Sequence, residues 1–284
     1  MEPMRKPAIN DLNDLPPKEW VQATKSVWYS RPGPRDRLKI QHPATFGEKD
    51  IERLICVFTK KGGRVLDPFL GTGSTLVACA AAGRNGVGIE LAPRWADVAR
   101  SRTAPFRSQR RLSDGGDDAL VKEPLSLKVI EGDARLELPK LAEGSFDLAV
   151  TSPPYFSILD KAKDHKSKAE RNGLATKYGD DARDLGNLPS YDDFLGELTG
   201  IWKECRRLLK PGKYICVVVT DFRDGPRYVL FHADVARTLE EAGFVPKGLL
   251  VLVQDNKTLY PYGYPYSFVP NIHHQNILVF RKEP

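Results

Sequence analysis

The sequence predicts an α/β protein with a doubly wound, mostly parallel sheet of seven strands and helices on both faces. Two observations support this fold class. From residue 64 onward, short apolar runs typical of buried strands alternate with segments of helical periodicity. A glycine-containing turn also follows the first of these runs and leads into an alanine-rich helix. The 284 residues suffice for one large domain, or for a domain with a small lobe.

The elements follow one another in a regular order. Pro93 precedes the second predicted helix, Lys210-Pro211-Gly212 follows the third and Gly243 follows the fourth, as expected for helix termini. The fifth strand is the richest in β-branched residues, which favour strands. The strands are expected at residues 65–68, 86–91, 127–131, 146–151, 214–220, 248–253 and 276–281, and the helices at 76–82, 94–103, 192–209 and 233–242.

Residues 1–63 are expected to form an N-terminal segment, and residues 64–284 the domain that contains the sheet. Three stretches interrupt the strand and helix order: a polar loop at 107–123, and the segments 156–190 and 255–274. The last two leave the carboxyl ends of the fourth and sixth strands, where open α/β sheets place their ligands. We therefore expect them to face the substrate.

Composition excludes several classes of protein. The 43 Lys and Arg residues against 37 Asp and Glu give a net charge of +6, which permits a polyanionic partner without requiring one. No apolar run is long enough to span a membrane. The four cysteines (Cys56, Cys79, Cys205 and Cys216) lie far apart without metal-ligand spacing, so we expect free thiols, no metal and a cytoplasmic protein.

Residues 67–74 read Asp67-Pro68-Phe69-Leu70-Gly71-Thr72-Gly73-Ser74 and connect the first strand to its helix. The glycines permit a tight turn and a close approach of the backbone to a ligand. Glu90 ends the next strand, where a carboxylate can accept from both hydroxyls of a ribose. Asp133, after the third strand, is placed to accept from an adenine amino group. Together these strand ends predict a site for a nucleoside-containing cofactor.

The chemistry of the turn favours S-adenosylmethionine as this cofactor. The turn lacks the glycine patterns of dinucleotide and P-loop sites, and Asp67 would repel a pyrophosphate. S-adenosylmethionine instead carries a sulfonium and an ammonium group, whose positive charges suit the Asp67 carboxylate better than the negative charges of a pyrophosphate do. The alternative is that Glu90 and Asp133 only cap the helices that follow them. The expected cofactor-binding residues are Asp67, Pro68, Phe69, Gly71, Gly73, Ser74, Glu90, Leu91, Asp133, Ala134 and Thr151.

The fourth strand runs into Thr151-Ser152-Pro153-Pro154-Tyr155, which we expect to be catalytic at Ser152, Pro153, Pro154 and Tyr155. Two prolines fix the backbone and remove two N–H donors. The Ser152 hydroxyl and the Pro153 carbonyl can then accept hydrogens from an exocyclic amine, whose lone pair is directed toward a methyl donor. Tyr155 offers a ring for stacking on a base. The alternative is a simple proline loop or a polyproline ligand.

These two motifs resemble those of the DNA amino-methyltransferases, which methylate N4 of cytosine or N6 of adenine. His42-Pro43-Ala44-Thr45-Phe46 with residues 48–58 is similar to the family segment that contacts the methionine part of the cofactor, and residues 271–282 resemble the late strand. The resemblance implies a Rossmann-like methyltransferase that uses S-adenosylmethionine, with Thr45 and Phe46 as further cofactor contacts. It also implies DNA as partner, a flipped target base and a restriction–modification setting. The Ser form of the catalytic motif favours cytosine.

Two features depart from the family pattern. The cofactor motif precedes the catalytic motif, whereas family members with these motif forms usually have the opposite order. No separate recognition domain is visible, so segments 156–190 and 255–274, with help from 20–37, should contact the substrate. The first contains Lys161, Lys163, Lys166, Lys168 and Arg171, which can neutralise phosphates or form a solvated loop. The second contains Tyr260, Tyr262, Tyr264, Tyr266 and Phe268, which can stack on bases or pack against the sheet.

Three alternatives stay open. The target can be N6 of adenine, or the substrate can be RNA, since some RNA amino-methyltransferases have a similar Pro-Pro-Tyr motif. The third is a nucleic-acid-binding protein with an inactive fold, which the retained Ser152, Glu90 and Asp133 disfavour. His273 and His274 are expected to be structural. The sequence does not predict an oligomeric state.

Overall fold

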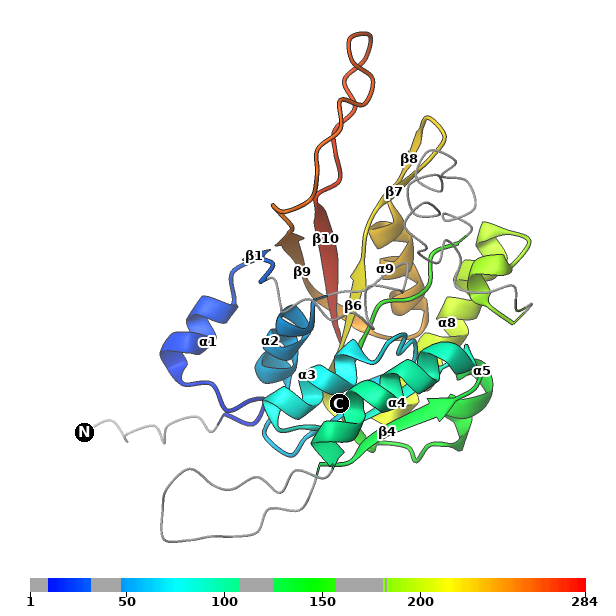
Figure 1. Ribbon diagram of the computed structural model, residues 1–284. Coiled ribbons are helices and arrows are strands. Elements are labelled where there is room, and N and C mark those ends of the chain that lie inside the picture. Colours follow the sequence, from blue (N-terminus) through cyan, green and yellow to red (C-terminus); the bar gives the residue numbers. More distant parts are fainter. Residues whose placement is uncertain (1–9, 32–46, 108–124, 157–180, 182) are drawn as a thin grey trace, which may run out of the picture.

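The computed structural model describes residues 10–31, 47–107, 125–156, 181 and 183–284. These residues form an eight-stranded sheet in the order β1-β9-β10-β6-β5-β2-β3-β4 (Figure 1). Its strands are β1 (Val27–Tyr29), β2 (Arg64–Asp67), β3 (Asn85–Glu90), β4 (Leu127–Glu131), β5 (Phe146–Thr151), β6 (Leu209–Val219), β9 (Val245–Val253) and β10 (His274–Arg281). The α/β class and all seven predicted strands are confirmed.

The predicted strand count was wrong by one. β1 is an eighth strand that pairs in parallel with β9, with Val27 opposite Val251. Its three residues are too few to show an alternating pattern, and only the side chain of Trp28 points inward, where it is 1% exposed. A short edge strand of this kind is defined by its partner rather than by its own sequence.

The sheet is mostly parallel, which brings several strand ends to one edge. β2 pairs in parallel with both β3 and β5, β3 with β4, and β5 with β6. β10 alone runs antiparallel, between β6 and β9. The carboxyl ends of β2 to β6 therefore meet at the same edge, and β9 and β10 extend the sheet beside them.

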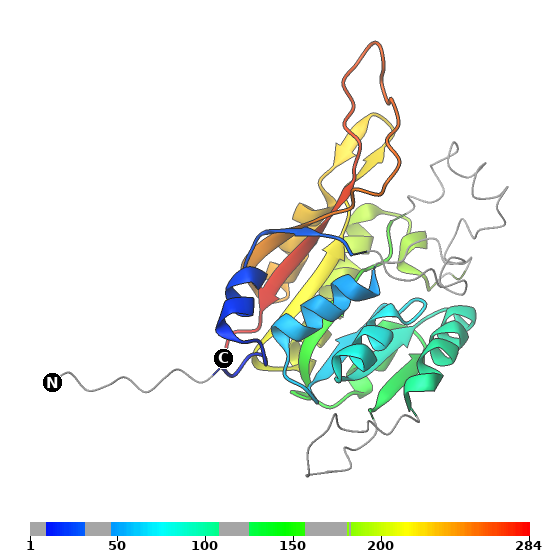
Figure 2. The same cartoon turned by 60° about the vertical axis from the view of Figure 1, so that its left-hand side comes forward.

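Helices cover both faces of the sheet (Figure 2). α2 (Glu48–Phe58), α3 (Ser74–Ala82) and α4 (Pro93–Arg107) lie on one face, and α5 (Ala134–Glu137), α8 (Tyr191–Leu208) and α9 (Phe231–Glu241) on the other. The short elements are α1 (Pro17–Ala23), η2 (Leu138–Lys140) and η3 (Leu185–Asn187), and the hairpin β7 (Phe222–Asp224) with β8 (Arg227–Val229) was not predicted.

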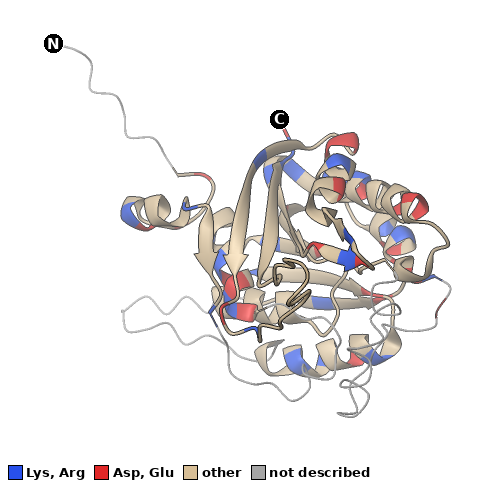
Figure 3. Ribbon diagram, turned by 90° about the horizontal axis from the view of Figure 1, so that it is seen from above, with Lys and Arg blue, Asp and Glu red and all other residues tan. Residues whose placement is uncertain are grey.

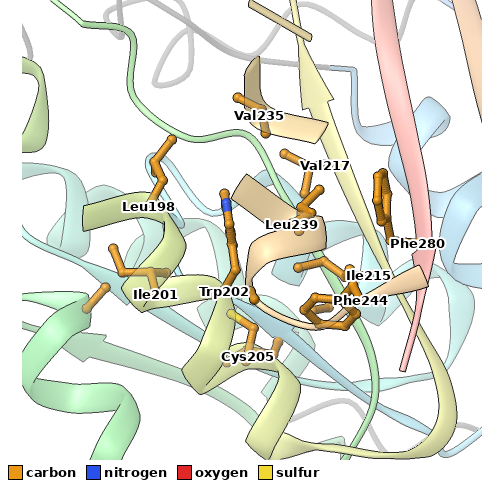
Figure 4. Packing of buried hydrophobic residues seen from close by; sticks show 14 of the residues in the cluster. Leu198, Ile201, Trp202, Cys205, Ile215, Val217, Val235, Leu239, Phe244 and Phe280 are labelled. Atoms are coloured by element: carbon orange, nitrogen blue, oxygen red, sulfur yellow. The ribbon is translucent and has the colours of Figure 1, made fainter. Parts of the chain in front are cut away.

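The central strands have apolar residues on both faces, which explains their continuous apolar runs. In β6, Ile215 and Val217 join the core under α8 and α9, whereas Cys216 and Val218 join the core under α2 and α3. Trp202 of α8 lies at the centre of the first core and is fully buried (Figure 4). The sheet is thus held between two apolar layers, and its strand ends are fixed on both sides.

The N-terminal segment contributes to this core. Ile51, Leu54 and Ile55 of α2 are at most 1% exposed and pack in the same cluster as Val65 and other sheet residues. The boundary placed at residue 63 stays a prediction, but the helix before it shares a core with the sheet after it.

The structure also bears on the cysteines, on metal-binding clusters and on membrane-spanning helices. All four cysteines are free thiols, and three of them are buried. Within the described ranges, no cluster of His, Cys, Asp or Glu could hold a metal ion. None of the helices in the part of the chain that the structure describes is long and apolar enough to cross a membrane.

Candidate active site

One cavity of about 460 Å³ opens at the carboxyl edge of the sheet, where the ends of β2 to β6 meet. It is lined by twelve of the predicted residues: Pro68, Phe69, Gly71, Ser74, Glu90, Leu91, Asp133, Ala134, Ser152, Pro153, Pro154 and Tyr155. The structure therefore brings the cofactor turn and the catalytic motif to the same space, although about 80 residues separate them in sequence. Asp67, Gly73 and Thr151 do not line it. Thr45 and Phe46 lie outside the described residues.

Asp67 does not line the cavity, but its hydrogen bonds connect the segments that do. Its carboxylate is 0% exposed and accepts from the hydroxyls of Thr75 at 2.5 Å and Thr151 at 2.6 Å, and from the N–H of Phe69 at 3.0 Å. Burial raises the pKa of Asp67 to about 6, although these hydrogen bonds oppose the shift. The contact of Asp67 with the cofactor charge therefore stays a prediction. Asp67 joins the cofactor turn to the strand end before Ser152.

The two glycines of the turn have different roles. Both adopt left-handed backbone conformations, with φ of 56° at Gly71 and 86° at Gly73. Gly71 lines the cavity, as predicted. A Cβ on Gly73 would lie 2.9 Å from the Cβ of Ala99, so the absence of a side chain at Gly73 permits α3 to begin close against α4. Gly73 does not line the cavity, and its contact with a cofactor stays a prediction.

Glu90 lines the cavity and also holds the turn. One carboxylate oxygen accepts from the N–H of Gly71 at 2.8 Å and the other from the N–H of Ala92 at 2.9 Å. The capping interpretation is therefore correct in part, but each oxygen retains a second lone pair. Burial raises the pKa of Glu90 to about 7, against the effect of these hydrogen bonds.

Asp133 accepts more hydrogen bonds at its carboxylate from the rest of the protein than Glu90 does. Its carboxylate caps α5 by accepting from the N–H of Arg135 at 2.9 Å, and it also accepts from the Arg135 guanidinium, with the shortest contact 2.7 Å. The capping interpretation thus describes Asp133 well. Asp133 lines the cavity, yet its hydrogen-bonding capacity is largely used by Arg135.

Ser74 provides a test of whether a polar ligand fits here. Its hydroxyl is buried, lines the cavity and has no hydrogen-bond partner among the described residues. An unsatisfied buried hydroxyl is costly, and a polar ligand group at the start of α3 would satisfy it. Trp95, which is 3% exposed, adds an apolar ring to the same lining. This combination of orphaned hydroxyl, carboxylate and ring fits a nucleoside-containing cofactor.

The catalytic motif forms the middle of the cavity wall. Tyr155 is held in place, because its hydroxyl accepts from the N–H of Thr220 at 3.1 Å and its ring packs on Phe231 at 5.6 Å. Burial raises the pKa of Tyr155, so its phenol stays protonated at neutral pH. Gly186 of η3 packs closely against this loop. A Cβ on Gly186 would lie 3.0 Å from the carbonyl oxygen of Tyr155, so a side chain there would crowd the motif.

At the far end of the cavity, Lys257 belongs to the predicted substrate-facing segment 255–274, but three further residues were not predicted. Thr220, Gln254 and Gln275 line it from the ends of β6, β9 and β10, and Lys257 joins them. Gln254 donates to the Gln275 side chain at 3.2 Å, and burial lowers the pKa of Lys257. The rule that identified Glu90, a polar residue at the end of a predicted strand, would also have identified Thr220 and Gln254.

The cavity therefore has two ends. Glu90, Ser74 and Trp95 lie at one end, and Thr220, Gln254 and Gln275 at the other, with the Ser152–Tyr155 loop between them in the strand order. The predicted substrate loop 156–190 lies largely outside the described residues, including the five cationic residues from Lys161 to Arg171. The second loop, 255–274, is described and projects away from the sheet.

Comparison with known proteins gives consistent results. Residues 2–101 and 146–284 match the sequence profile of a DNA methylase family, the N6/N4 methylases. The type II methyltransferase M.BglI of Bacillus subtilis is 36% identical over 103 residues, which cover 36% of this chain and 29% of that enzyme. M.MthZI of Methanothermobacter thermautotrophicus is 40% identical over 89 residues, 30% of this chain and 25% of that enzyme.

Among solved structures, TrmN from Thermus thermophilus aligns with 83% of this chain and 48% of its own, with 16% identity and a TM-score of 0.47. The match with each of the two curated relatives covers less than a third of that enzyme's length.

Proposed function

The chain belongs to the N6/N4 family of DNA methylases, and from this premise we propose that it transfers a methyl group from S-adenosylmethionine to an exocyclic amine of a base in DNA. One observation supports the proposal most strongly. The cofactor turn and the Ser152–Tyr155 motif, predicted separately from the sequence, line a single cavity. A methyl transfer requires its donor and acceptor to meet in this way.

The cofactor end is proposed to bind the nucleoside and methionine parts of S-adenosylmethionine, which supplies an electrophilic methyl group. Glu90 accepts from the ribose hydroxyls, and Ser74 hydrogen-bonds a polar group of the ligand. Thr45 and Phe46 are proposed as further contacts. In support, Arg102 joins Glu48, two residues beyond Phe46, to Thr72 of the turn.

The Ser152–Tyr155 loop is proposed to hold the target base. The Ser152 hydroxyl and the Pro153 carbonyl accept the two amine hydrogens, which favours a pyramidal nitrogen with an available lone pair. This nitrogen bonds to the methyl carbon as the carbon–sulfur bond breaks, and the nitrogen then releases one proton to water. The base must leave the duplex to reach this position, so we propose that it is flipped.

Cytosine N4 is the proposed target, with adenine N6 as the alternative. The proposal rests on Ser152, the form of the motif that the resemblance associates with cytosine. The cavity geometry supports an amine-bearing ring of either kind. The cytoplasm is the proposed compartment, in agreement with four free thiols.

Incubation with tritiated S-adenosylmethionine and unmodified PCR-amplified DNA, followed by digestion to nucleosides, tests the proposal. We expect the label in N4-methylcytosine. Label in N6-methyladenine would contradict the choice of base but retain DNA amino-methylation. No transfer to DNA of any sequence would contradict the function. Parallel reactions with transfer RNA separate the RNA alternative, which requires label in RNA and none in DNA.

A further inference from the structure

Residues 256–273 form a long projection, which we call the finger, beyond the carboxyl edge of the sheet (Figures 1 and 2). The sequence left two roles open for its aromatic residues, stacking on bases or packing against the sheet. Tyr264, Tyr266 and Phe268 are 80%, 95% and 93% exposed, so they do not pack on the sheet. Three large exposed rings on one short segment are unusual on a soluble surface.

The finger is held in shape by its own hydrogen bonds. The Asn271 side chain accepts from the N–H of Tyr260 at 2.9 Å and donates to its carbonyl at 2.8 Å, which joins the two sides of the finger. Near the tip, the N–H groups of Tyr266 and Ser267 donate to the carbonyl of Gly263 at 2.8 and 2.7 Å. The exposed rings are therefore presented on an ordered backbone, which lowers the entropic cost of binding.

The finger begins and ends at the cavity. Gln254 just before it, Lys257 at its start and Gln275 after its end line the far end of the cavity. The aromatic residues do not line it, but surround a separate shallow hollow of about 480 Å³. The rings therefore do not line the space next to Ser152, and the finger that carries them projects beyond the edge of the sheet at which the cavity opens.

Charge is consistent with a polyanionic partner. The sequence contains no Asp or Glu from residue 256 to residue 282, and Figure 3 shows the finger without acidic residues. The hairpin β7–β8 projects from the same edge and contains Arg223 and Arg227 beside Asp224. An aromatic surface without negative charge can approach stacked bases and the phosphates that flank them.

We propose that the finger stacks Tyr264, Tyr266 and Phe268 on the DNA bases next to the flipped nucleotide. This inference rests on the proposed function, because it requires DNA as the substrate. Extrusion of a base exposes the faces of its neighbours, and aromatic rings that cover these faces offset the cost of unstacking.

The test uses the full chain with the double substitution Tyr266→Ala and Phe268→Ala. Loss of two stacking rings is expected to raise the KM for PCR-amplified duplex DNA and the dissociation constant measured by fluorescence anisotropy by about 30-fold or more. The affinity for S-adenosylmethionine should not change. The slope of log affinity against log salt should also stay the same, because no cationic group is removed.

The matched control is Tyr266→Phe with Phe268→Tyr, which keeps both rings and should behave as the wild type. Phe268→Leu, which keeps an apolar side chain at a 93% exposed position, gives a second reading if the double alanine variant folds poorly. Equal DNA affinity in the wild type and the ring-less variants would overturn the proposal, as would an equal loss in the ring-retaining control. Absence of methyl transfer by the wild type contradicts the proposed function instead, and the anisotropy comparison still decides whether the finger binds DNA.

Discussion

The hydroxyl of Ser152 is proposed to act on the amine and not on the cofactor, so the two functions should separate in a variant. We expect Ser152→Ala to lower kcat about 10- to 100-fold, in line with the loss of one hydrogen bond that forms in the transition state. The dissociation constant for S-adenosylmethionine, measured by calorimetry, should stay within twofold of the wild type, that is, about 0.4 kcal/mol. An equal loss of turnover and cofactor affinity would contradict the assigned role.

Glu90 should make cofactor binding depend on pH. Ribose hydroxyls donate to the ionised carboxylate, and the pKa of Glu90 is raised to about 7 in the protein without ligand. The affinity for S-adenosylmethionine should therefore rise as the pH increases through 7, and fall roughly tenfold per pH unit well below it. Calorimetry across this range measures the slope.

The stability of the free protein should depend on Glu90 in the opposite direction. Its folded pKa of about 7 lies above the ordinary value of 4.5, so the stability that it contributes is present below pH 4.5 and lost as the pH rises through 7.

Glu90→Gln serves as the control for the binding prediction, because it should abolish the pH slope of binding and weaken the affinity for S-adenosylmethionine about tenfold or more. A slope that persists in this variant would assign the pH dependence to another group.

Glu90 and Asp67 show what a strand-end rule can predict. Both are acidic residues at the ends of buried strands, and the sequence treats them alike. Glu90 lines the cavity, whereas the Asp67 carboxylate is buried and accepts hydrogen bonds from the hydroxyls of Thr75 and Thr151, which lie 8 and 84 residues away in the sequence. The position of a carboxylate relative to the sheet edge can be predicted from the sequence, but its hydrogen-bond partners depend on tertiary contacts.

The start of α3 depends on the absence of a side chain at Gly73. We expect Gly73→Ala to destabilise the protein by about 2–4 kcal/mol, from the left-handed backbone together with the overlap with Ala99 on α4. Gly144→Ala is the matched control, since Gly144 also has a positive φ, 60°, but no atom within 4 Å of the added Cβ. It should cost only about 1–2 kcal/mol. Urea unfolding measures both, and equal losses would exclude a steric role for Gly73.

The elements differ in how far sequence could predict them. Long strands such as β6 have apolar residues on both faces and show as continuous runs, so they were predicted from the sequence. The start of β6 was placed five residues too late, because Leu209 to Lys213 precede the β-branched run and were assigned to the end of the preceding helix. The three-residue strands β1, β7 and β8 gain their definition from pairing partners and left no pattern of their own. Short edge strands are the elements for which tertiary context outweighs local preference.

At the scale of the whole molecule, the parallel sheet explains why distant motifs meet. The residues that line the cavity span the chain from Pro68 to Gln275, and they come together because parallel strands end at a common edge. Topology alone therefore makes the existence of the site predictable. Of the residues at its far end, Gln254 follows a predicted strand and obeys the strand-end rule, whereas Gln275 lies at the start of β10 and required knowledge of the antiparallel pairing of β10 with β9.

The shared core further predicts that the N-terminal helix and the rest of the molecule unfold together. Leu54 of α2 and Leu198 of α8 are both 0% exposed, on opposite faces of one sheet. We expect Leu54→Ala and Leu198→Ala each to lower the free energy of unfolding by about 2–5 kcal/mol. Because the sheet couples the two layers, each substitution should lower the midpoint urea concentration at which α2 and α8 lose their protection from exchange, and by the same amount for both helices. Hydrogen-exchange mass spectrometry at increasing urea measures both helices in one sample. If Leu54→Ala shifts the midpoint of α2 alone, residues before 64 form an independent unit, and the segment boundary is also a boundary of cooperative folding.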